Sequence, residues 1–418
     1  MTACAKPQVI VVGGGMITRI QLLPTLYHLQ REGLLGEIHI CALNTPPLKE
    51  LQDDAGLRAA FPRQSFVPHP DPFRVSPREM YPDIYKEVFA AAPAGSLAVI
   101  AVPDQLHYTV LQAALACNLH VCIVKPLVLS YAQAEEIAHL AYERGLMVGV
   151  EYHKRFDTRS LMARREYRSG RLGEFRLGQA HLHEPWYYRD SNFQNWMLCE
   201  NSDMFTYVGC HYVDLVAFVT GLRPVSVSVY GVKDTFPNGK AGFLWTDGRV
   251  IWENGAVLSV ANAIGYPNAG AGGNSQGLAM WGQGKNDATL LYHSDQYRGV
   301  KHSYVQAGGD PGDTVYAEPN PDYFRMLDVG GEGLAPSGYG HRSVEYIVRA
   351  CCQAAAIPDL RERQKLVKRY DAEGIMATPV NSSYNELVIE AGRMSILSGG
   401  RDVQIDYGPQ AGVRFRSY

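Results

Sequence analysis

The lysine of the pair Lys125-Pro126 stands where a side chain could act on a substrate oxygen. The pair follows an apolar run at residues 121–124, which is typical of a buried parallel strand. Far earlier in the chain, three glycines at residues 13–15 follow another apolar run at residues 8–12. A glycine loop between a strand and a helix can hold a phosphate, because backbone N–H groups point at the ligand there. The ends of parallel strands line the cofactor crevice of a doubly wound sheet, where an ammonium can stabilise charge on an oxygen. Together the two features predict a nicotinamide-dependent enzyme that acts on an alcohol or a carbonyl.

The first 150 residues alternate between short apolar runs and helical patterns. Apolar runs that indicate buried strands lie at residues 8–12, 37–43, 97–102, 121–124 and 146–150. Helical spacing of apolar residues appears between them, over residues 83–92, 107–117 and 131–144. This alternation predicts an α/β Rossmann domain over residues 1–150, a doubly wound parallel sheet with helices on both faces. Pro24, in the helix expected after the glycine loop, should kink that helix unless it falls in the first turn.

The remainder of the chain, residues 151–418, changes character. Helical spacing appears over residues 161–169 and 205–220, and strand-like alternation covers residues 175–183, 225–230, 244–252 and 256–263. We therefore predict a second, α+β domain with a large, mostly antiparallel sheet. Residues 265–341 are rich in Gly, Tyr, Asn and Asp, and we expect long loops and edge strands there.

Composition and charge argue against several classes of protein. The 418 residues are 46% hydrophobic and carry a net charge of -3, which is typical of a globular protein without a basic footprint for nucleic acid. No apolar run approaches the ~18 residues of a membrane span, and the start of the chain has no apolar core of signal-peptide length. The 8 cysteines form no CxxC pair, so we expect free thiols and a cytoplasmic location. We therefore expect neither nucleic acid nor a membrane as a partner, and the family resemblance given below implies a small carbohydrate molecule instead.

The glycine loop matches the dinucleotide pattern G-x-G-x-x-G only in part, and a plain turn is the alternative. Gly13 and Gly15 occupy the first two glycine positions, and Thr18 occupies the third, where its hydroxyl could fit near the helix start. An acid for the ribose hydroxyls, or an arginine for a 2′-phosphate, usually follows the second strand. Residues 41–46 contain neither, and Asn44 is the candidate ribose ligand. NAD is slightly favoured because no arginine is adjacent, and NADP stays open.

Five ordered segments resemble motifs of the Gfo/Idh/MocA oxidoreductase family. They are a strand with a Pro-x-x-x-His turn at 99–107, a strand ending in Lys-Pro at 118–126, an Arg-Phe crossover at 149–157, a Gly-x-x-Gly link at 168–174 and a Gly-x-His-x-x-Asp helix at 208–215. The tail at 391–405 is also similar, whereas residues 240–340 have no clear counterpart. The resemblance implies NAD(P)-dependent redox chemistry on sugars or polyols, and a Rossmann domain followed by an antiparallel α/β domain. It also implies a homo-oligomer, a dimer or tetramer, formed through the open face of the sheet.

The resemblance places Lys125 and His211 on the family's catalytic lysine and histidine. Two departures matter. Val124 replaces the glutamate that the family has before its lysine, and Tyr207 replaces an aspartate one helical turn before the histidine. A phenol therefore joins the imidazole where a carboxylate is usual. Each of these three residues could also have a purely structural role. Lys125 could be a surface lysine, and His211 and Tyr207 could belong to the core.

The expected site residues fall into three groups. The catalytic residues are Lys125, His211 and Tyr207. The cofactor residues are Gly13, Gly14, Gly15, Met16, Ile17, Asn44, Val102, Pro103, His107, Lys125 and Pro126. The substrate residues are Lys125, Tyr152, His153, Arg155, His183, Trp186, Tyr187, Tyr207 and His211. Some have other readings: His107 could cap a helix, Arg155 could join domains electrostatically, and the aromatic pair at 186–187 could simply pack. No metal is expected, because His181 and His183 share one face of a strand without a clear third ligand.

Three functional hypotheses follow. In the first, the protein is an NAD(P)-dependent dehydrogenase of a cyclic sugar, glycoside or polyol, with His211 as general base and Lys125 stabilising the alkoxide. In the second, it is an NAD-dependent glycoside hydrolase that oxidises a ring hydroxyl transiently, and Tyr207 supplies the base for the resulting carbon acid. In the third, it is a sensor with a relic fold, which the retention of Lys125 and His211 argues against.

Overall fold

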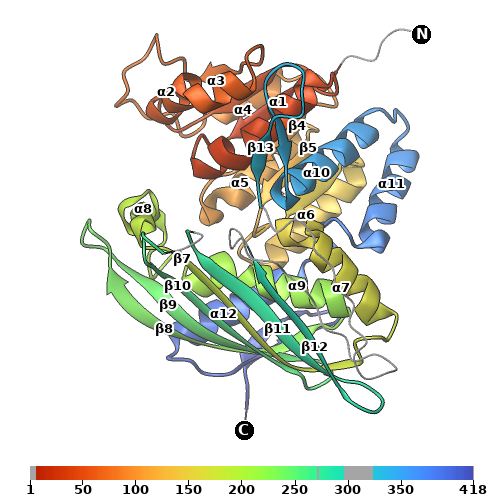
Figure 1. Ribbon diagram of the computed structural model, residues 1–418. Coiled ribbons are helices and arrows are strands. Elements are labelled where there is room, and N and C mark those ends of the chain that lie inside the picture. The colour runs from red at the N-terminus through yellow and green to blue at the C-terminus, as the bar shows by residue number, and fades with distance from the viewer. Residues whose placement is uncertain (1–5, 271–272, 296–322, 418) are drawn as a thin grey trace. The chain divides into compact units, whose positions relative to one another are not determined.

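The computed structural model describes residues 6–270, 273–295 and 323–417, which form two compact units (Figure 1). The first unit contains Met1–Val128, Ala132–His153 and Tyr323–Asn381, and the second contains Leu129–Tyr131, Lys154–Asp322 and Ser382–Tyr418. The chain thus leaves the first unit and later returns to it. The division into domains 1–150 and 151–418 stays a prediction. That division did not assign the late segment Tyr323–Asn381 to the first unit, in which the structure groups it.

The first unit is built on a six-stranded sheet whose paired strands are all parallel, in the order β3-β2-β1-β4-β5-β6. The strands are β1 Val9–Val12, β2 Ile38–Cys41, β3 Val67–His69, β4 Leu97–Ile100, β5 His120–Val124 and β6 Val148–Glu151. The predicted doubly wound parallel sheet is therefore confirmed. Sequence patterns missed β3, which is three residues long and contains Pro68, a residue that is tolerated because β3 lies at the sheet edge. The strand order reverses between β1 and β4, and ligands bind outside the carboxyl ends of strands at such a point.

Helices join these strands in the alternating order that the sequence predicts. They are α1 Leu23–Arg31, α2 Pro46–Asp53, α3 Ala55–Ala60, α4 Ile84–Ala91, α5 His107–Ala116 and α6 Tyr131–Arg144. Pro24 is the second residue of α1 and directly follows a π-helical turn, so its missing N–H lies where the hydrogen-bond pattern of the helix already changes. A π-helical turn, Thr18–Leu22, connects the glycine loop to α1.

The late segment of the first unit covers part of its sheet. It contains the hairpin of β13 Arg325–Leu327 and β14 Ala335–Ser337, followed by α10 Tyr339–Ala355 and α11 Leu360–Glu373. Helix α10 packs on β5 and β6 and beside α1. Gly149 in β6 makes this possible, because a Cβ there would lie 2.5 Å from the side chain of Ile347 on α10.

The second unit contains an eight-stranded sheet in the order β12-β11-β7-β10-β9-β8-β15-β16 (Figure 1). The strands are β7 Glu174–Pro185, β8 Pro224–Thr235, β9 Ala241–Trp252, β10 Val257–Tyr266, β11 Ser275–Gln283, β12 Ala288–Asp295, β15 Val403–Asp406 and β16 Gly412–Phe415. Strands β7 and β10 pair in parallel and the other neighbouring strands pair antiparallel, which confirms a mostly antiparallel sheet. The expectation of only loops and edge strands over 265–341 is wrong for β11, which lies between β12 and β7. Sequence patterns missed β11 because residues 276–280 are all buried, so the strand lacks the alternation of buried and exposed side chains by which strands are usually recognised.

One face of this second sheet carries helices and the other carries exposed aromatic side chains. The helices are α7 Thr158–Arg168, α8 Phe193–Trp196, α9 Cys210–Thr220, which continues the π-helical turn η5 Phe205–Gly209, and α12 Tyr384–Leu397. The Phe205 ring occupies the space above Gly248 in β9 and beside Gly392 in α12, where a Cβ would lie 2.6 and 2.9 Å away. The opposite face, called the outer face below, exposes Leu177, Tyr230, Trp245, Trp281 and Tyr292.

Candidate active site

The glycine loop after β1 is shaped for a close approach of backbone to backbone. Gly13 has φ +113°, and a Cβ at this position would lie 2.1 Å from the carbonyl oxygen of Ala101, just past β4. The Gly13 N–H donates to the Cys41 carbonyl oxygen over 2.8 Å. Gly13 is therefore required by the fold itself, since no other residue fits both the φ and the contact.

The next part of the loop is open, as a ligand site requires. A Cβ on Gly15 would meet no atom within 4 Å, and the side chain of Met16 is 41% exposed. Thr18, at the position of the usual third glycine, is fully buried, and its hydroxyl donates to the Gly13 carbonyl oxygen over 2.6 Å. The hydroxyl thus ties the helix start to the loop. The loop and the following backbone N–H groups fit the pyrophosphate of a dinucleotide.

His107 holds the ends of two strands together. Its ring is fully buried, with Nδ1 2.7 Å from the Pro126 carbonyl oxygen after β5 and Nε2 2.9 Å from the Val102 carbonyl oxygen after β4. These contacts favour a positioning role for His107 over the expected contact with the cofactor. The Val102 backbone N lies 3.5 Å from where a Cβ on Gly13 would stand, Pro103 follows it, and Asn44 follows β2, where its amide lies 3.7 Å from the Met80 sulfur.

Lys125 directly follows β5 and its side chain is 9% exposed. The preceding residue, Val124, pairs in register with Glu151 at the end of β6. Lys125 thus lies at the carboxyl edge of the sheet that also carries the glycine loop, as predicted. Tyr152, the residue after Glu151, is 1% exposed, so its ring belongs to the packed interior of the unit.

Sequence reasoning missed Glu151, which is the centre of a buried polar cluster in the first unit. Its Oε1 accepts from Gln21 Nε2 over 2.7 Å and from the Ser343 hydroxyl over 2.5 Å, and its Oε2 lies 3.2 Å from His153 Nδ1. Glu151 is 2% exposed. An acid at the end of an otherwise apolar strand could have been noticed in the sequence. Its partners Gln21 and Ser343 could not, because they lie far from Glu151 along the chain.

In the second unit, the helix that carries His211 is fixed by its own aspartate. Asp214 accepts from Arg155 through Nε at 2.8 Å and Nη2 at 2.6 Å, and also from Tyr384 and Asn385. Arg155 is 2% exposed. This buried two-pronged pair favours a positioning role for Arg155 over the expected substrate contact, because its Nε and Nη2 both donate to Asp214. His211, one turn before Asp214 on α9, is 5% exposed.

Tyr207 lies in a cluster of aromatic rings formed with the segment 186–196. Its ring centroid is 5.1 Å from that of Phe193 and 5.5 Å from that of Trp196, and Phe193 stacks on Tyr188. Burial raises the pKa of the Tyr188 phenol, and the neighbouring Glu184 and Tyr207 raise it further. The outermost residues are Trp186 and Tyr187, which are 45% and 53% exposed. Trp186 has the Arg189 guanidinium 3.7 Å from its ring centroid, and Tyr187 packs edge-on against Tyr188, so a ligand contact at these two residues stays a prediction.

His183 is not brought to the same face of the sheet as His211. Asn262 in β10 faces η5, since a Cβ on Gly209 would lie 2.7 Å from its Oδ1, and it pairs with Leu182 in β7. Side chains alternate along a strand, so His181 and His183 point to the outer face. Burial lowers the pKa of both histidines, and His181 Nε2 lies 3.0 Å from the Ser275 hydroxyl. Among the described residues, no three His, Cys, Asp or Glu side chains gather as a metal site would require.

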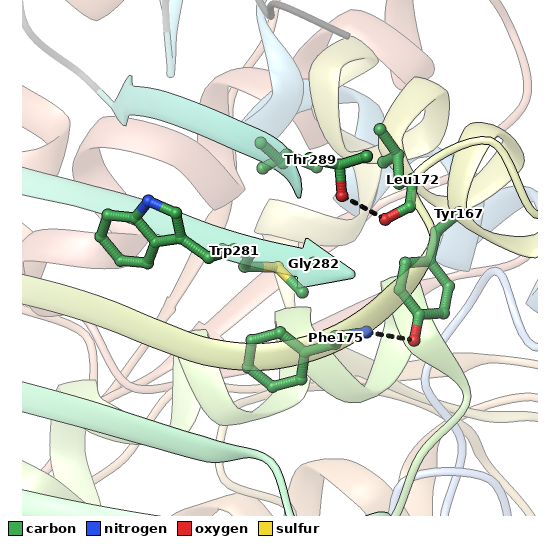
Figure 2. A pocket seen from close by; sticks show the side chains of 8 residues that line it. Tyr167, Leu172, Phe175, Trp281, Gly282 and Thr289 are labelled. Carbon is green, nitrogen blue, oxygen red and sulfur yellow. Dashed lines mark hydrogen bonds between the residues drawn. The ribbon is translucent and has the colours of Figure 1, made fainter. Parts of the chain in front are cut away.

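A small cavity between α7 and β7, β11 and β12 is part of the packing and not a ligand site. It measures about 10 Å³, close to the minimum for one water molecule. Figure 2 shows that its polar groups are engaged with each other: the Tyr167 hydroxyl accepts from the Phe175 N–H over 3.2 Å, and the Thr289 hydroxyl donates to the Leu172 carbonyl oxygen over 2.5 Å.

Comparison with known proteins identifies the family of this chain. Residues 8–152 match the NAD-binding Rossmann fold of the oxidoreductase family Gfo/Idh/MocA, and residues 160–266 match the C-terminal domain of the same family. The chain belongs to the Gfo/Idh/MocA oxidoreductase family. The family prediction and the prediction of an NAD-type cofactor are thereby confirmed. The glycine loop and Lys125 both lie within the residues that match the NAD-binding domain of the family.

Curated relatives match parts of the chain. An uncharacterised oxidoreductase of Schizosaccharomyces pombe is 34% identical over 99 residues, which cover 24% of this chain and 27% of the relative. A scyllo-inositol 2-dehydrogenase (NADP(+)) of Bacillus subtilis is 23% identical over 248 residues, which cover 56% of this chain and 61% of the relative. The chain spans only 27% and 36% of the lengths of two S. pombe relatives.

Solved structures match almost the whole chain. An inositol dehydrogenase homologue from Azotobacter vinelandii, complexed with NADH and myo-inositol, has a TM-score of 0.65 and 20% identity over 96% of this chain and 98% of that one. GenD2 from gentamicin A biosynthesis, in complex with NAD, has a TM-score of 0.64 and 16% identity over 97% of this chain and 98% of that one. At such identities the likeness confirms the fold. Within the part of the chain that the structure describes, no helix has the length and apolarity to cross a membrane.

Proposed function

We propose that the protein is an NAD(P)-dependent dehydrogenase that oxidises a ring hydroxyl of a cyclic polyol, sugar or glycoside. The observation that carries this proposal is Lys125, a nearly buried ammonium at the carboxyl end of β5, in the same sheet as the open glycine loop. The names of the inositol dehydrogenases among its relatives support the choice of a cyclic polyol.

The proposed chemistry divides between a lysine and a histidine. Bound NAD(P) supplies the acceptor for the hydride that leaves the substrate carbon. Lys125 donates a hydrogen bond to the reacting oxygen and stabilises the negative charge that develops on it. His211 removes the hydroxyl proton as general base, a role suited to an imidazole because its ordinary pKa lies near neutral pH. Tyr207 holds the hydroxyl in place or shares the proton transfer.

The experiment that tests this proposal is a panel of cyclic polyols, sugars and glycosides incubated with the purified protein and NAD or NADP. Formation of stoichiometric NADH or NADPH, with every glycosidic bond intact, is the expected result. NAD is the favoured cofactor because residues 41–46 contain no arginine for a 2′-phosphate. If neither dinucleotide is reduced by any member of the panel, the proposal is wrong.

A second candidate is an NAD-dependent glycoside hydrolase, which Tyr207 favours because it stands where the family has a carboxylate. Such an enzyme needs a second base to remove the carbon-bound proton next to the oxidised centre. An ordinary phenol, with a pKa near 10, is a poor base at neutral pH unless a cation lowers that value. Glycosides incubated in deuterated water distinguish the two enzymes. Deuterium in the released sugar without net NADH indicates the hydrolase, and in that case Tyr207→Phe should still reduce NAD but stall before cleavage.

We also propose where the enzyme is located and how it assembles. All described cysteines are free, and we propose a cytoplasmic location. We further propose a homo-oligomer, a dimer or tetramer, that assembles through the outer face of the second sheet.

A further inference from the structure

A loop that follows β3, residues 70–80, closes over the carboxyl end of β2 and is called the β3 loop below. At its start, the His69 carbonyl oxygen accepts from the Ala42 N–H over 2.9 Å. At its end, the Tyr81 N–H donates to the Leu43 carbonyl oxygen over 2.7 Å. In a dinucleotide-binding sheet, the residues that follow the second strand contact the ribose of the adenosine half. The β3 loop is therefore tied at both ends beside the place of that ribose.

The last part of the β3 loop contacts Asn44, the expected ribose ligand. The Asn44 amide nitrogen lies 3.7 Å from the Met80 sulfur. The apolar side chains of Leu43 and Met80 are 52% and 60% exposed, although both lie at the end of a buried strand. Ligand sites are lined mainly by apolar side chains with a few polar groups among them. Exposed Leu43 and Met80 beside the Asn44 amide thus fit an adenine ring and its ribose.

The β3 loop also brings an arginine to this place, although no arginine follows β2 in the sequence. Arg78 precedes Met80 by two residues, which span at most ~7 Å of backbone, and its side chain is exposed. The long Arg78 side chain can therefore reach the ribose beside Asn44.

Two neighbouring cations are paired with carboxylates, whereas Arg78 is not. Arg74 Nε lies 3.2 Å from Asp71 Oδ2 within the same loop, and Lys49 Nζ on α2 lies 2.8 Å from Asp53 Oδ2. Across the described ranges of the chain, no carboxylate forms an ion pair with the Arg78 guanidinium. Arg78 is thus a cation that a ligand phosphate can engage without the loss of an ion pair.

The start of α2 offers few donors to a phosphate at the end of β2, so the charge for one must come from a side chain. Pro46 and Pro47 open α2, and proline has no backbone N–H. A guanidinium can donate two parallel hydrogen bonds to a phosphate, which makes arginine well suited to this role. An arginine near the ribose is the usual means by which a dinucleotide-binding sheet accommodates a 2′-phosphate.

We propose that Arg78 binds the 2′-phosphate of NADP, and that the protein therefore accepts NADP as well as NAD. The inference rests on the proposed function and specifies its cofactor. Residues 41–46 alone favour NAD, because they contain no arginine. The fold brings a second segment to the same place, and its arginine offsets that preference.

A solvated Arg78 on a loop that only covers the sheet edge is the competing explanation. Arg74→Gln is the matched control, because Arg74 is also an exposed arginine of the β3 loop but is paired with Asp71. If Arg78 is only a surface charge, Arg78→Gln and Arg74→Gln should change the affinities for both dinucleotides alike.

The test is calorimetric titration of the dinucleotide-free protein with NAD and NADP, and with 5′-AMP and 2′,5′-ADP, which differ by the 2′-phosphate. In the wild type we expect affinities for NAD and NADP within about tenfold of each other. Arg78→Gln should lower the affinities for NADP and 2′,5′-ADP about tenfold to a hundredfold, because charge-assisted hydrogen bonds are lost, and should affect NAD and 5′-AMP far less. Arg74→Gln should keep the wild-type ratio of NADP to NAD affinity.

Two further measurements locate the phosphate. Asn44→Asp places a carboxylate beside it and should lower the affinity for NADP more than the affinity for NAD, because like charges repel. Added salt screens an exposed charge pair, so it should weaken NADP binding more in the wild type than in Arg78→Gln. Equal losses for the two dinucleotides in Asn44→Asp, or equal salt dependence in the two proteins, would contradict the assignment.

The outcomes separate this inference from the proposed function. If the wild type oxidises a polyol with either dinucleotide but Arg78→Gln keeps the wild-type ratio of affinities, the proposed function stands and the role of Arg78 is wrong. If the wild type reduces neither dinucleotide, the proposed function is wrong, and the titrations with 5′-AMP and 2′,5′-ADP still decide the inference. An affinity for 2′,5′-ADP that Arg78→Gln does not lower, or that Arg74→Gln lowers equally, overturns it.

Discussion

At the scale of single residues, two glycines of one loop have different reasons to be glycine. Gly13 is needed by the fold, because any Cβ would collide with the Ala101 carbonyl oxygen. Gly15 has an ordinary φ and open space around it, so the protein itself would accept a larger residue there. The pattern of three glycines in sequence could not separate these reasons, since the neighbours come from β4, far along the chain.

Gly15→Val should therefore abolish NAD binding without loss of stability, because the branched side chain occupies the space that the pyrophosphate needs. Calorimetric titration with NAD and thermal unfolding measure the two effects. Gly412→Val is the matched control, since a Cβ on Gly412 also meets no atom within 4 Å and its φ is ordinary. Unchanged NAD affinity in Gly15→Val would remove the glycine loop from the cofactor site.

Lys125→Ala should lower turnover far more than NAD affinity. The ammonium acts on the substrate oxygen in the proposal, and loss of a preorganised stabilising group commonly costs ~100-fold or more in rate. Steady-state kinetics on the best substrate, beside calorimetry with NAD, give the comparison. Near wild-type turnover would make Lys125 a structural lysine and would contradict the central claim.

At the scale of elements, strands in a parallel sheet were easier to predict than the parts that complete the site. Apolar runs such as 97–102 and 121–124 indicated β4 and β5, because strands buried on both faces need no long-range information to be recognised. The register of Val124 with Glu151, and the contacts of Glu151 with Gln21 and Ser343, depend on chain segments that meet only in the folded unit. His107 and Lys125 were found through their motifs, whereas only the contacts show that His107 bridges two carbonyl oxygens.

The ion pair between Arg155 and Asp214 should hold helix α9 in its position. Asp214→Ala leaves a guanidinium buried without its carboxylate, and removal of one partner of such a pair commonly costs about 3–5 kcal/mol of unfolding free energy. Denaturant unfolding measures this loss. Asp406→Ala is the control, because its pair with Arg414 is solvent-exposed and contributes at most ~1 kcal/mol. Equal effects of the two substitutions would show that Asp214 does not anchor the helix.

His120, at the start of β5, should make the protein less stable in mild acid. Burial, with a smaller effect from Arg363, lowers the pKa of His120 from 6.5 to about 4, and its Nδ1 accepts from the Met147 N–H over 3.0 Å. Between these pH values the unfolded chain binds the proton and the folded chain does not, so stability is full above 6.5 and falls as the pH approaches 4. The loss of unfolding free energy between pH 7 and pH 4.5 should be smaller in His120→Gln by roughly 2–3 kcal/mol. His139→Gln, at an exposed position of α6, should lose as much as the wild type, and an equal loss in His120→Gln would refute the assignment.

At the scale of the whole molecule, the outer face of the second sheet exposes several large apolar and aromatic side chains. Trp281 and Leu177 pair in register on β11 and β7, with exposed fractions of 37% and 45%, and further aromatic side chains lie on β8, β9 and β12. Large exposed apolar side chains gathered on one face often mark an interface, which agrees with the proposed oligomer. Sequence patterns identified the sheet but not β11, and therefore not the extent of this face.

Trp281→Arg should shift the proposed dimer or tetramer toward monomer, because a charge at the centre of an apolar interface must be desolvated. Light scattering after size-exclusion chromatography gives the mass directly. Phe73→Arg, at a residue of the first unit that is 83% exposed, is the control and should leave the mass unchanged. A wild-type protein that is already monomeric at assay concentration would contradict the proposed oligomer.

The return of residues 323–381 to the first unit also bears on how the protein is made. A ribosome releases β1 to β6 early, but α10 emerges only after β7 to β12 have been synthesised. Until then, the face of β5 and β6 on which Ile347 later packs has no cover, and the Glu151 carboxylate lacks Ser343. An apolar surface exposed on a nascent chain is a target for chaperones and a risk for aggregation. Completion of the nucleotide-binding unit is thus coupled to synthesis of the strands of the second unit that precede α10.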